Sequence, residues 1–303
     1  MSKHISESEL LKFKKEYERL LLSDVKIINS IIRYLSRRKG KLLRPALIIN
    51  IGKTLGELNS KSYLGASLIE MIHLATLIHD DIVDESSLRR GWPTISRIWK
   101  NKVSLLIGDY IFSKSLSTVI KLNDIDLIKI ISNAAGRLSK GELLQFQSSK
   151  NSSMSEKTYY RMIKDKTASL FVAACELSAR ISSEKARDIE NFKEFGENFG
   201  MAYQIKDDLN DVVGLDVDLG KPTSLDLKRN MLTLPYIYCL DNLGSLERKI
   251  FLRKMKGLSS RNKRKKITKI VTDFGAIDYC KEKIRGHIER CKTSISSYSN
   301  NKE

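Results

Sequence analysis

The stretch Glu70–Asp84, EMIHLATLIHDDIVD, contains no proline or glycine and ends in three aspartates. Together with its surroundings, from Lys61 to about Glu85, it predicts a long and largely buried helix, because apolar residues dominate until the aspartates begin. Earlier in the chain, Glu9–Leu35 carries apolar residues at spacings of three and four, which predicts one helical stripe. Further helical patterns occupy about 102–121, 124–148, 155–181 and 185–213. A loop follows at Asp218–Pro222, and helical patterns then resume to the C-terminus.

Composition favours an all-helical, soluble and cytoplasmic protein. The 303 residues include only four prolines, and contents of 41% hydrophobic and 30% charged residues exclude intrinsic disorder. The charged N-terminus lacks a signal-peptide core, and the longest apolar runs, such as Leu42–Ile51, are shorter than the ~20 residues that a membrane span needs. The four cysteines form no C-x-x-C pair and no Cys/His cluster, which excludes a zinc site. Without strand alternation or a linker, we expect one all-α domain over residues 1–303.

The net charge of +18 is unevenly distributed along the chain. Residues 245–303 carry 17 lysines and arginines against six acidic residues, and the densest run is Arg261–Lys266. This basic C-terminal helical region, 245–303, is compatible with a solvated helix face, with weak contact to an anionic membrane, or with nucleic acid. No aromatic residues alternate with the basic run, as a platform for single-stranded nucleic acid would require. We therefore expect a solvated face or a membrane contact, and no nucleic acid.

Two aspartate clusters of identical spacing are the first sign of chemistry. Asp80-Asp81-Ile-Val-Asp84 ends the long helix, and Asp207-Asp208-Leu-Asn-Asp211 lies in another apolar helical segment. Carboxylates four residues apart share a helix face and repel one another unless a cation lies between them. Gln204 extends the polar stripe of the second cluster. Two such helices facing each other would form an all-oxygen cage, which favours Mg²⁺ over zinc or iron.

Basic residues near these clusters indicate what the metal holds. Gly40-Lys-Leu-Leu-Arg-Pro45 offers two cations on a turn before a helix N-terminus, and Arg89-Arg90 follows the first cluster. Each such residue alone is most often a surface charge. Cations that alternate with metal-binding carboxylates are typical of a diphosphate site, and here the set is Lys41, Arg44, Arg89, Arg90, Lys166 and Lys221.

These motifs resemble those of the trans (all-E) polyprenyl diphosphate synthases, and in particular long-chain enzymes of octaprenyl and heptaprenyl type. The resemblance covers nearly the whole chain, and the number of ordered motifs makes it specific. The matching stretches are Gly40–Pro45, Glu70–Asp84, Leu88–Gly91, Gly141–Gln145, Lys166–Ala168, Tyr203–Asp211 and Leu219–Pro222.

The resemblance implies a single-domain helical bundle around a central active-site cavity, the isoprenoid synthase type I fold, in a homodimer. It also implies about three Mg²⁺ ions bound with diphosphate. The metal-binding residues would be Asp80, Asp81, Asp84, Asp207, Asp208 and Asp211. The allylic diphosphate would be bound by Arg89, Gln145, Lys166, Thr167, Gln204 and Lys221. Isopentenyl diphosphate would be bound by Lys41, Arg44, His73 and Arg90.

The reaction that the resemblance implies is head-to-tail chain elongation. The allylic carbon–oxygen bond would break heterolytically because metal ions and cationic side chains stabilise the departing diphosphate. The isopentenyl double bond would attack the allylic cation, and a proton would be lost to the departing diphosphate. No protein nucleophile is needed, and the catalytic set would be Asp80, Asp84, Asp207, Arg89 and Lys166.

Product length is expected to depend on residues just before the first aspartate cluster. In the family a bulky aromatic residue there blocks the growing chain, whereas this sequence has Ile72, Ala75 and Thr76. We therefore expect a product longer than farnesyl, suited to a quinone side chain. One departure from the family is Met231, which occupies the place of a lysine in many relatives and puts one phosphate contact in doubt.

Several alternatives remain open. A synthase of shorter product, geranylgeranyl or farnesyl diphosphate, has the same motifs. A terpene cyclase on this scaffold usually replaces the second cluster with an Asn/Ser/Glu triad, and a non-catalytic subunit of a heteromeric synthase tends to lose aspartates, but both clusters are intact here. A basic adaptor for nucleic acid or membranes would use the helices only as a scaffold.

Overall fold

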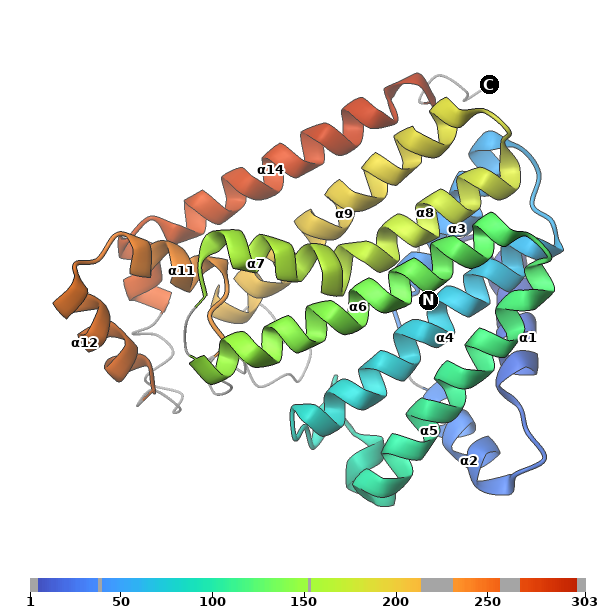
Figure 1. Cartoon of the computed structure of the whole chain (residues 1–303), viewed down its shortest axis with the longest axis horizontal. Helices are drawn as coiled ribbons and strands as arrows, with labels where there is room; N and C mark the ends of the chain where they lie inside the picture. The colour runs from blue at the N-terminus through green and yellow to red at the C-terminus, as the bar shows by residue number, and fades with distance from the viewer. Residues whose placement is uncertain (1–4, 38–39, 152–153, 214–230, 257–267, 299–303) are drawn as a thin grey trace. The chain divides into compact units, whose positions relative to one another are not determined.

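The computed structural model describes residues 5–37, 40–151, 154–213, 231–256 and 268–298 (Figure 1). Within these ranges the chain is helical except for one hairpin of two-residue strands, which confirms the all-α fold class. The elements are α1 (Glu7–Leu21), α2 (Lys26–Ser36), α3 (Leu43–Leu55), α4 (Ser60–Val83), β1 (Leu88–Arg89), β2 (Trp92–Pro93), α5 (Ile95–Val119), η1 (Ile120–Leu122), α6 (Ile125–Asn151), α7 (Glu156–Ile163), η2 (Lys164–Ala168), α8 (Ser169–Ser182), α9 (Ala186–Val213), α11 (Leu234–Asp241), α12 (Ser245–Lys256), α14 (Ala276–Ser294) and η4 (Ser296–Tyr298).

The chain is organised as two compact units. The first comprises Met1–Gly136, Leu170–Gly196 and Ser294–Glu303, and the second comprises Arg137–Ser169 and Glu197–Thr293. A single domain over residues 1–303 stays a prediction. The basic region 245–303 contains α12 and α14, while its run Arg261–Lys266 lies outside the described residues.

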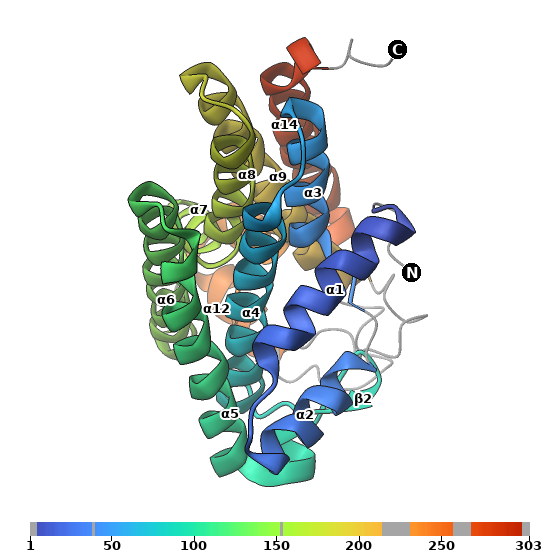
Figure 2. The same ribbon diagram turned by 90° about the vertical axis from the view of Figure 1, so that its right-hand side faces the viewer.

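The first unit is built around α4, against which α1, α3 and α5 pack (Figure 2). Its side chains are buried on several faces, and Leu68, Ile69 and Ile72 have no solvent exposure. Asn59 caps the start of the helix, because its side chain accepts a hydrogen bond from the backbone nitrogen of Ser62. The long, largely buried helix predicted around Glu70–Asp84 is therefore confirmed.

The one stripe predicted over Glu9–Leu35 is divided between α1 and α2. Between them, the Ser23 nitrogen donates to Asn29 Oδ1 at 3.0 Å, and Asn29 Nδ2 donates to the Ser23 carbonyl at 2.7 Å. These bonds satisfy backbone groups that a continuous helix would have paired, so the chain can turn here. The apolar spacing continues across the break because each helix buries one face.

The stretch Ile95–Leu122, α5 with η1, is the one helical stretch in the described ranges whose length and hydropathy suit a membrane span. Charged residues such as Asp109 interrupt it, which is why the sequence shows no unbroken apolar run. The helix α5 packs against α4, and its buried residues include Ile107 and Ile111. On the opposite face Leu105 and Leu116 are exposed.

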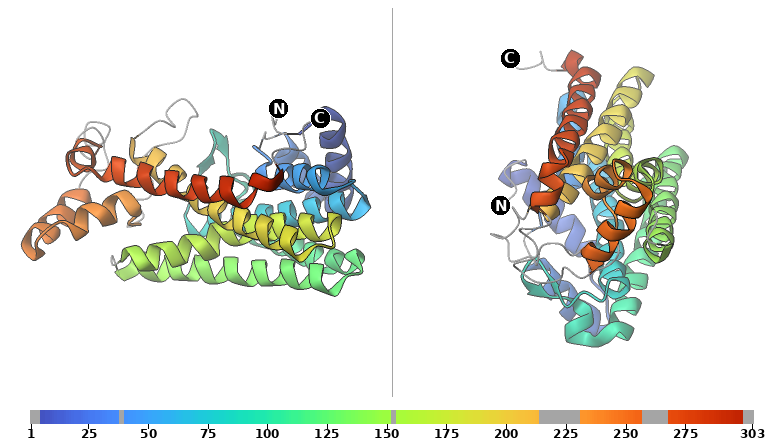
Figure 3. Two further views of the ribbon diagram at one scale, coloured as in Figure 1. Left: turned by 90° about the horizontal axis from the view of Figure 1, so that it is seen from above. Right: turned by 90° about the vertical axis from the view of Figure 1, so that its left-hand side faces the viewer.

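The second unit has its own core. Tyr159, Ile205 and Tyr236 are fully buried within it. The helices α9 and α14 run side by side (Figure 3), and His287 on α14 is hydrogen-bonded through Nδ1 to Asn198 Oδ1 at 2.9 Å. By contrast, α12 is largely exposed, and of its described side chains only Phe251 is buried.

Candidate active site

The first aspartate cluster lies at the C-terminal end of α4. Asp80 and Asp81 are in the last turn, Asp84 is the C-cap, and the turn contains no basic residue. Carboxylates at this end of a helix oppose its dipole and destabilise it unless a cation is bound. Asp81 is buried, and Arg89 Nε donates to its Oδ1 at 2.8 Å. Asp80 and Asp84, four residues apart and half-buried, share the face that suits a cation.

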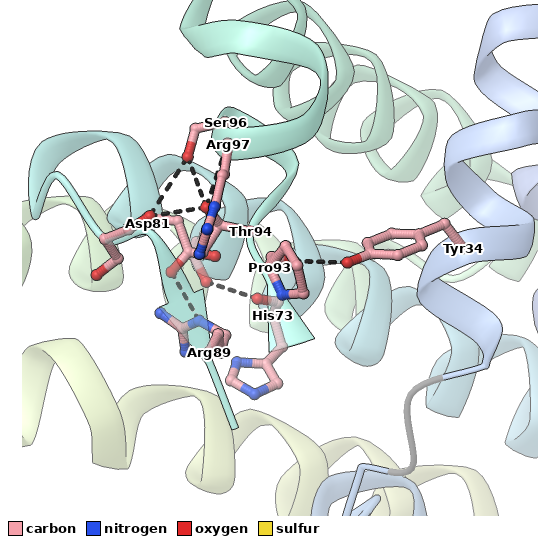
Figure 4. A network of polar contacts seen from close by, with 10 residues as sticks. Tyr34, His73, Asp81, Arg89, Pro93, Thr94, Ser96 and Arg97 are labelled. Carbon is pink, nitrogen blue, oxygen red and sulfur yellow. Dashed lines mark hydrogen bonds and ion pairs between the residues drawn. The ribbon is translucent and has the colours of Figure 1, made fainter. Parts of the chain in front are cut away.

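A hairpin carries the two arginines that follow this cluster. Leu88–Arg89 pairs antiparallel with Trp92–Pro93, and Arg90 and Gly91 form the turn with φ values of 51° and 78°. Two positive φ values in a two-residue turn are typical of type I′, which matches the twist of a hairpin. Tyr34 fixes the second strand by donating to the Pro93 carbonyl at 2.7 Å, while Arg89 is fixed by Asp81 (Figure 4). The hairpin was not predicted, and the Arg-Gly dipeptide was its only signal in the sequence.

Three of the four residues predicted to bind isopentenyl diphosphate lie together in the first unit. Burial, and then the charges of nearby guanidiniums that include Arg44 and Arg90, lower the pKa of His73 well below its usual value. The imidazole is therefore neutral at pH 7. Glu70, one turn before His73, lies near the same two arginines; burial raises its pKa, and the guanidiniums oppose that rise. Arg44 also lies over the Phe171 ring at 4.3 Å. Glu70 and Phe171 are partners that sequence reasoning missed.

The second aspartate cluster lies in the last turns of α9, in the second unit. As in α4, no basic residue occupies the last turn. Asp207 is exposed, Asp211 is half-buried, and Asp208 is 5% exposed. Burial raises the pKa of Asp208 to about 7; hydrogen bonds from Tyr159 and Gln204 oppose the rise, and the neighbouring aspartates add to it. The middle aspartate is thus buried against protein partners, as Asp81 is in the first cluster.

Lys166 and Thr167 lie on η2, a five-residue π-helix between α7 and α8. A π-helix holds an extra residue in its turn, is rare, and is frequent at functional sites. Lys166 Nζ pairs with Glu142 Oε2 at 2.7 Å, and Thr167 Oγ1 donates to Gln204 Oε1 at 2.7 Å. Gly141 on α6 lies against η2, because a Cβ at this position would be 2.7 Å from Lys166 Cα. This close approach requires glycine.

The remaining predicted substrate residues are in different surroundings. Gln145 Nε2 lies 2.9 Å from Met231 Sδ, so the residue that departs from the family pattern touches a predicted binding residue. Lys41 is exposed just before α3. Lys221 lies outside the described residues.

The residues predicted to govern product length are on the buried part of α4. Ile72 and Ala75 have no solvent exposure. Thr76 is half-buried, and its hydroxyl donates to the His73 carbonyl within the same helix at 2.9 Å. A larger side chain at position 75 would therefore be accommodated inside the protein and not in solvent.

The aspartates fit a hard divalent cation. Across residues 5–298, apart from the gaps in the described ranges, no three carboxylate, imidazole or thiol side chains converge as a metal site. The donors on α4 and α9 are nevertheless all carboxylates at the ends of helices. Oxygen donors of this kind suit Mg²⁺ or Ca²⁺ better than zinc.

A profile of the Polyprenyl synthetase family matches residues 25–274. The chain belongs to the polyprenyl synthetase family. This member is accordingly an enzyme, a trans-prenyltransferase, and prenyl chain elongation is its reaction. Polyprenyl synthetases use a divalent metal and take isopentenyl and allylic diphosphates as substrates.

Similar proteins carry long-chain names. The all-trans-nonaprenyl-diphosphate synthase (geranyl-diphosphate specific) of Rhodobacter capsulatus is 33% identical over 274 residues, 90% of this chain and 84% of that protein. Heptaprenyl diphosphate synthase component 2 of Bacillus subtilis is 35% identical over 230 residues, 75% of this chain and 66% of that protein. The crystal structure of a polyprenyl synthase from Caulobacter crescentus complexed with calcium and isoprenyl diphosphate matches with a TM-score of 0.89 and 28% identity, over 97% of this chain and 90% of that one. The predicted all-α isoprenoid synthase fold is thereby confirmed.

Proposed function

We propose that this polyprenyl synthetase condenses isopentenyl diphosphate repeatedly with an allylic diphosphate, in the presence of Mg²⁺, to make a long all-trans polyprenyl diphosphate. The observation that carries the proposal is the pair of aspartate clusters at the C-terminal ends of α4 and α9, neither of which has a basic residue in its last turn. Folding would not favour this arrangement, because each cluster opposes its helix dipole. Bound divalent cations, about three in the proposal, remove that cost.

Asp80, Asp84 and Asp207 are the proposed principal metal ligands, with Asp211 in support. The solvent access of Asp80, Asp84 and Asp207 supports that role. Asp81 and Asp208, by contrast, are buried against protein partners. When bound, the metal would neutralise negative charge that develops on the departing diphosphate. The side chains of this enzyme would hold the metal and the diphosphate in one orientation before the reaction begins.

Cationic side chains are proposed to bind the two diphosphates. The cluster of Arg44, His73 and Arg90, with Lys41, would hold isopentenyl diphosphate, because positive charges around a neutral imidazole favour an anion. The allylic diphosphate would be bound by Arg89, Gln145, Lys166, Thr167, Gln204 and Lys221. Breaking the carbon–oxygen bond leaves an allylic cation, which the isopentenyl double bond attacks, and the departing diphosphate takes the proton that is lost.

A long product is proposed because nothing bulky occupies the positions before Asp80. Ile72 and Ala75, on a buried stretch of α4, are aliphatic residues without an aromatic ring. Ala75→Phe should shorten the product, because the aromatic ring takes up interior volume that the growing chain would need. An unchanged product distribution by reversed-phase chromatography would contradict this assignment of the length-determining position.

The chain is proposed to form a homodimer through α5. The exposed face of this helix carries Leu105, Leu106 and Leu116. It also carries Asp109, whose side chain is 61% exposed, and a charge in the middle of the face disfavours burial in a bilayer. A second copy of the chain is the occupant that we propose.

The enzyme is proposed to be cytoplasmic and to contact an anionic membrane through α12. Such a contact would suit an enzyme whose polyprenyl product is used for a quinone side chain. On α12, Leu246 is 70% and Ile250 46% exposed, and Arg248, Lys249 and Arg253 surround them. Exposed apolar residues among basic ones favour the surface of an anionic membrane. Sedimentation with phosphatidylglycerol vesicles should be lost at high salt and in Leu246→Ser/Ile250→Ser, but not in Lys14→Ser/Lys15→Ser, which alters exposed lysines on α1. Vesicle binding that does not depend on salt concentration would contradict the proposed membrane contact.

Incubation of the purified protein with labelled isopentenyl diphosphate and geranyl, farnesyl or geranylgeranyl diphosphate tests the main proposal. Extended products should form with Mg²⁺ and disappear after chelation by EDTA. No product with any primer would contradict the proposal. Products no longer than geranylgeranyl would identify a short-chain synthase, and cyclic hydrocarbons a terpene cyclase.

A further inference from the structure

Four side chains in the second unit form a continuous hydrogen-bonded chain. The proposed mechanism uses two of them, Thr167 and Gln204, to bind diphosphate, and it gives no role to Tyr159. Tyr159 Oη on α7 donates to Asp208 Oδ2 at 2.6 Å. Gln204 Nε2 donates to the other oxygen of the same carboxylate, Oδ1, at 2.7 Å. Thr167 Oγ1 on η2 donates to Gln204 Oε1 at 2.7 Å. Both oxygens of Asp208 therefore accept hydrogen bonds from protein side chains.

This chain is shielded from water. Tyr159 has no solvent exposure, Asp208 is 5% exposed, and Thr167 is 7% exposed. Hydrogen bonds to a carboxylate are strong in such surroundings, and a buried polar group that loses its partner is costly. The directions of the bonds are also linked. Because the Gln204 amide nitrogen faces Asp208, its carbonyl faces Thr167, and the Thr167 hydroxyl must donate to it.

The chain connects two elements at two points. Tyr159 and Thr167 are eight residues apart on the continuous segment of α7 and η2, while Gln204 and Asp208 are one turn apart on α9. Two separate contacts prevent a rotation that one contact would permit. Lys166 and Asp207, which the proposed function assigns to diphosphate and metal, are the immediate neighbours of Thr167 and Asp208.

We propose that Tyr159 is a positioning residue of the allylic diphosphate site. Its hydroxyl holds Asp208, and through Gln204 it holds Thr167, so that η2 and the end of α9 keep one separation before substrate binds. The inference rests on the proposed function for its catalytic consequence, but the coupling between Tyr159 and η2 does not. Tyr159 was not predicted from the sequence, because nothing local distinguishes it from Tyr160 beside it.

Tyr159→Phe is the decisive variant, because it removes only the hydroxyl and leaves the ring in the core. Tyr160→Phe is the control: it also removes a tyrosine hydroxyl from α7, but Tyr160 is half-buried and its hydroxyl is near Glu156 and not Asp208. Hydrogen exchange followed by mass spectrometry should show faster exchange over Lys164–Ala168 in Tyr159→Phe alone. Equal exchange in the two variants would overturn the proposal, whether or not the enzyme makes polyprenyl diphosphate.

Kinetics and binding test the catalytic consequence. Tyr159→Phe should weaken binding of farnesyl thiodiphosphate with Mg²⁺, measured by calorimetry, about 5- to 100-fold, the range expected when a buried carboxylate loses a hydrogen bond. The KM for isopentenyl diphosphate should not change.

In a Thr167→Val background the effect of Tyr159→Phe should shrink, because the hydrogen-bonded chain is already broken. Additive effects, or equal losses for both substrates, would reduce Tyr159 to a purely structural role and overturn the positioning proposal. If exchange at η2 responds as expected but the wild type makes no product, the proposed function fails and the coupling stands.

Discussion

Individual aspartates at helix ends are residues where the proposed function opposes stability in this protein. Asp80 and Asp84 lie at the C-terminal end of α4, where the helix dipole disfavours negative charge. Asp81 differs from them because Arg89 neutralises it. Three carboxylates that look equivalent in the sequence therefore differ in burial and in their protein partners.

Asp80→Asn should lower turnover about 10²–10³-fold, because it removes electrostatic stabilisation of the departing group. In metal-free protein the same change should raise the free energy of unfolding by about 0.3–1 kcal/mol, because a charge that opposes the helix dipole is lost. Steady-state kinetics and urea denaturation in EDTA measure the two effects.

Asp241→Asn is the matched control, since Asp241 is the exposed last residue of α11. It should raise stability similarly and leave turnover unchanged. If Asp80→Asn retained activity, the assignment of this carboxylate to the metal would be wrong.

At the scale of elements, the contact between α6 and η2 depends on one glycine. Gly141 has no space for a Cβ, because Lys166 backbone atoms lie against it. Gly136, earlier on the same helix, is exposed, and a Cβ there would have nothing within 4 Å. Of these two glycines on α6, Gly141 therefore has no room for a side chain, whereas Gly136 has ample room.

Gly141→Ala should destabilise the protein by about 1–3 kcal/mol, because the backbone of η2 must shift. It should also reduce activity, since Lys166 moves with that backbone. Gly136→Ala should stabilise the protein by about 0.5–1 kcal/mol through helix propensity alone. Thermal denaturation of both variants checks these signs, and a stable, fully active Gly141→Ala would contradict the close approach.

A histidine between α9 and α14 should make stability depend on pH. Burial, assisted by Arg290 and Lys283 and opposed by Glu197, lowers the pKa of His287 to about 4. In the unfolded chain His287 has a pKa near 6.5, so between pH 6.5 and 4 it is protonated there while it stays neutral in the folded protein. The neutral imidazole therefore contributes fully to the free energy of unfolding above about pH 6.5, and this contribution falls as the pH drops toward 4.

The urea midpoint of the wild type should therefore fall between pH 7.5 and pH 5 by more than that of His287→Gln. Because His287 is only partly buried, solvent screening reduces the size of the difference. Identical pH profiles for the two proteins would show that the imidazole is protonated equally in the folded and unfolded states.

At the scale of the whole molecule, the exposed face of α5 predicts that the chain forms a dimer. Leu105→Glu/Leu116→Glu places charges on this face without touching the buried face that contains Ile107 and Ile111. We expect the wild type to be a dimer by light scattering and the variant to be a folded monomer. A control variant, Leu11→Glu, alters an exposed leucine on α1 and should remain dimeric. A monomeric wild type would contradict the proposed interface.

The sequence by itself determined the all-α class, the long buried helix around Glu70–Asp84 and the pairing of acidic with basic motifs. These follow from spacing and composition, which act over one or two helical turns. Tertiary structure alone decided which aspartates are buried, that Arg90 lies in a hairpin turn, and that Tyr159 and not Tyr160 meets Asp208. Such facts depend on contacts between residues far apart in the chain, whose neighbours no local pattern specifies. The same physical reason explains why the π-helix at η2 was missed, because Gly141 of α6 packs against it. The break between α1 and α2 differs, because it is made locally by the hydrogen bonds between Asn29 and Ser23.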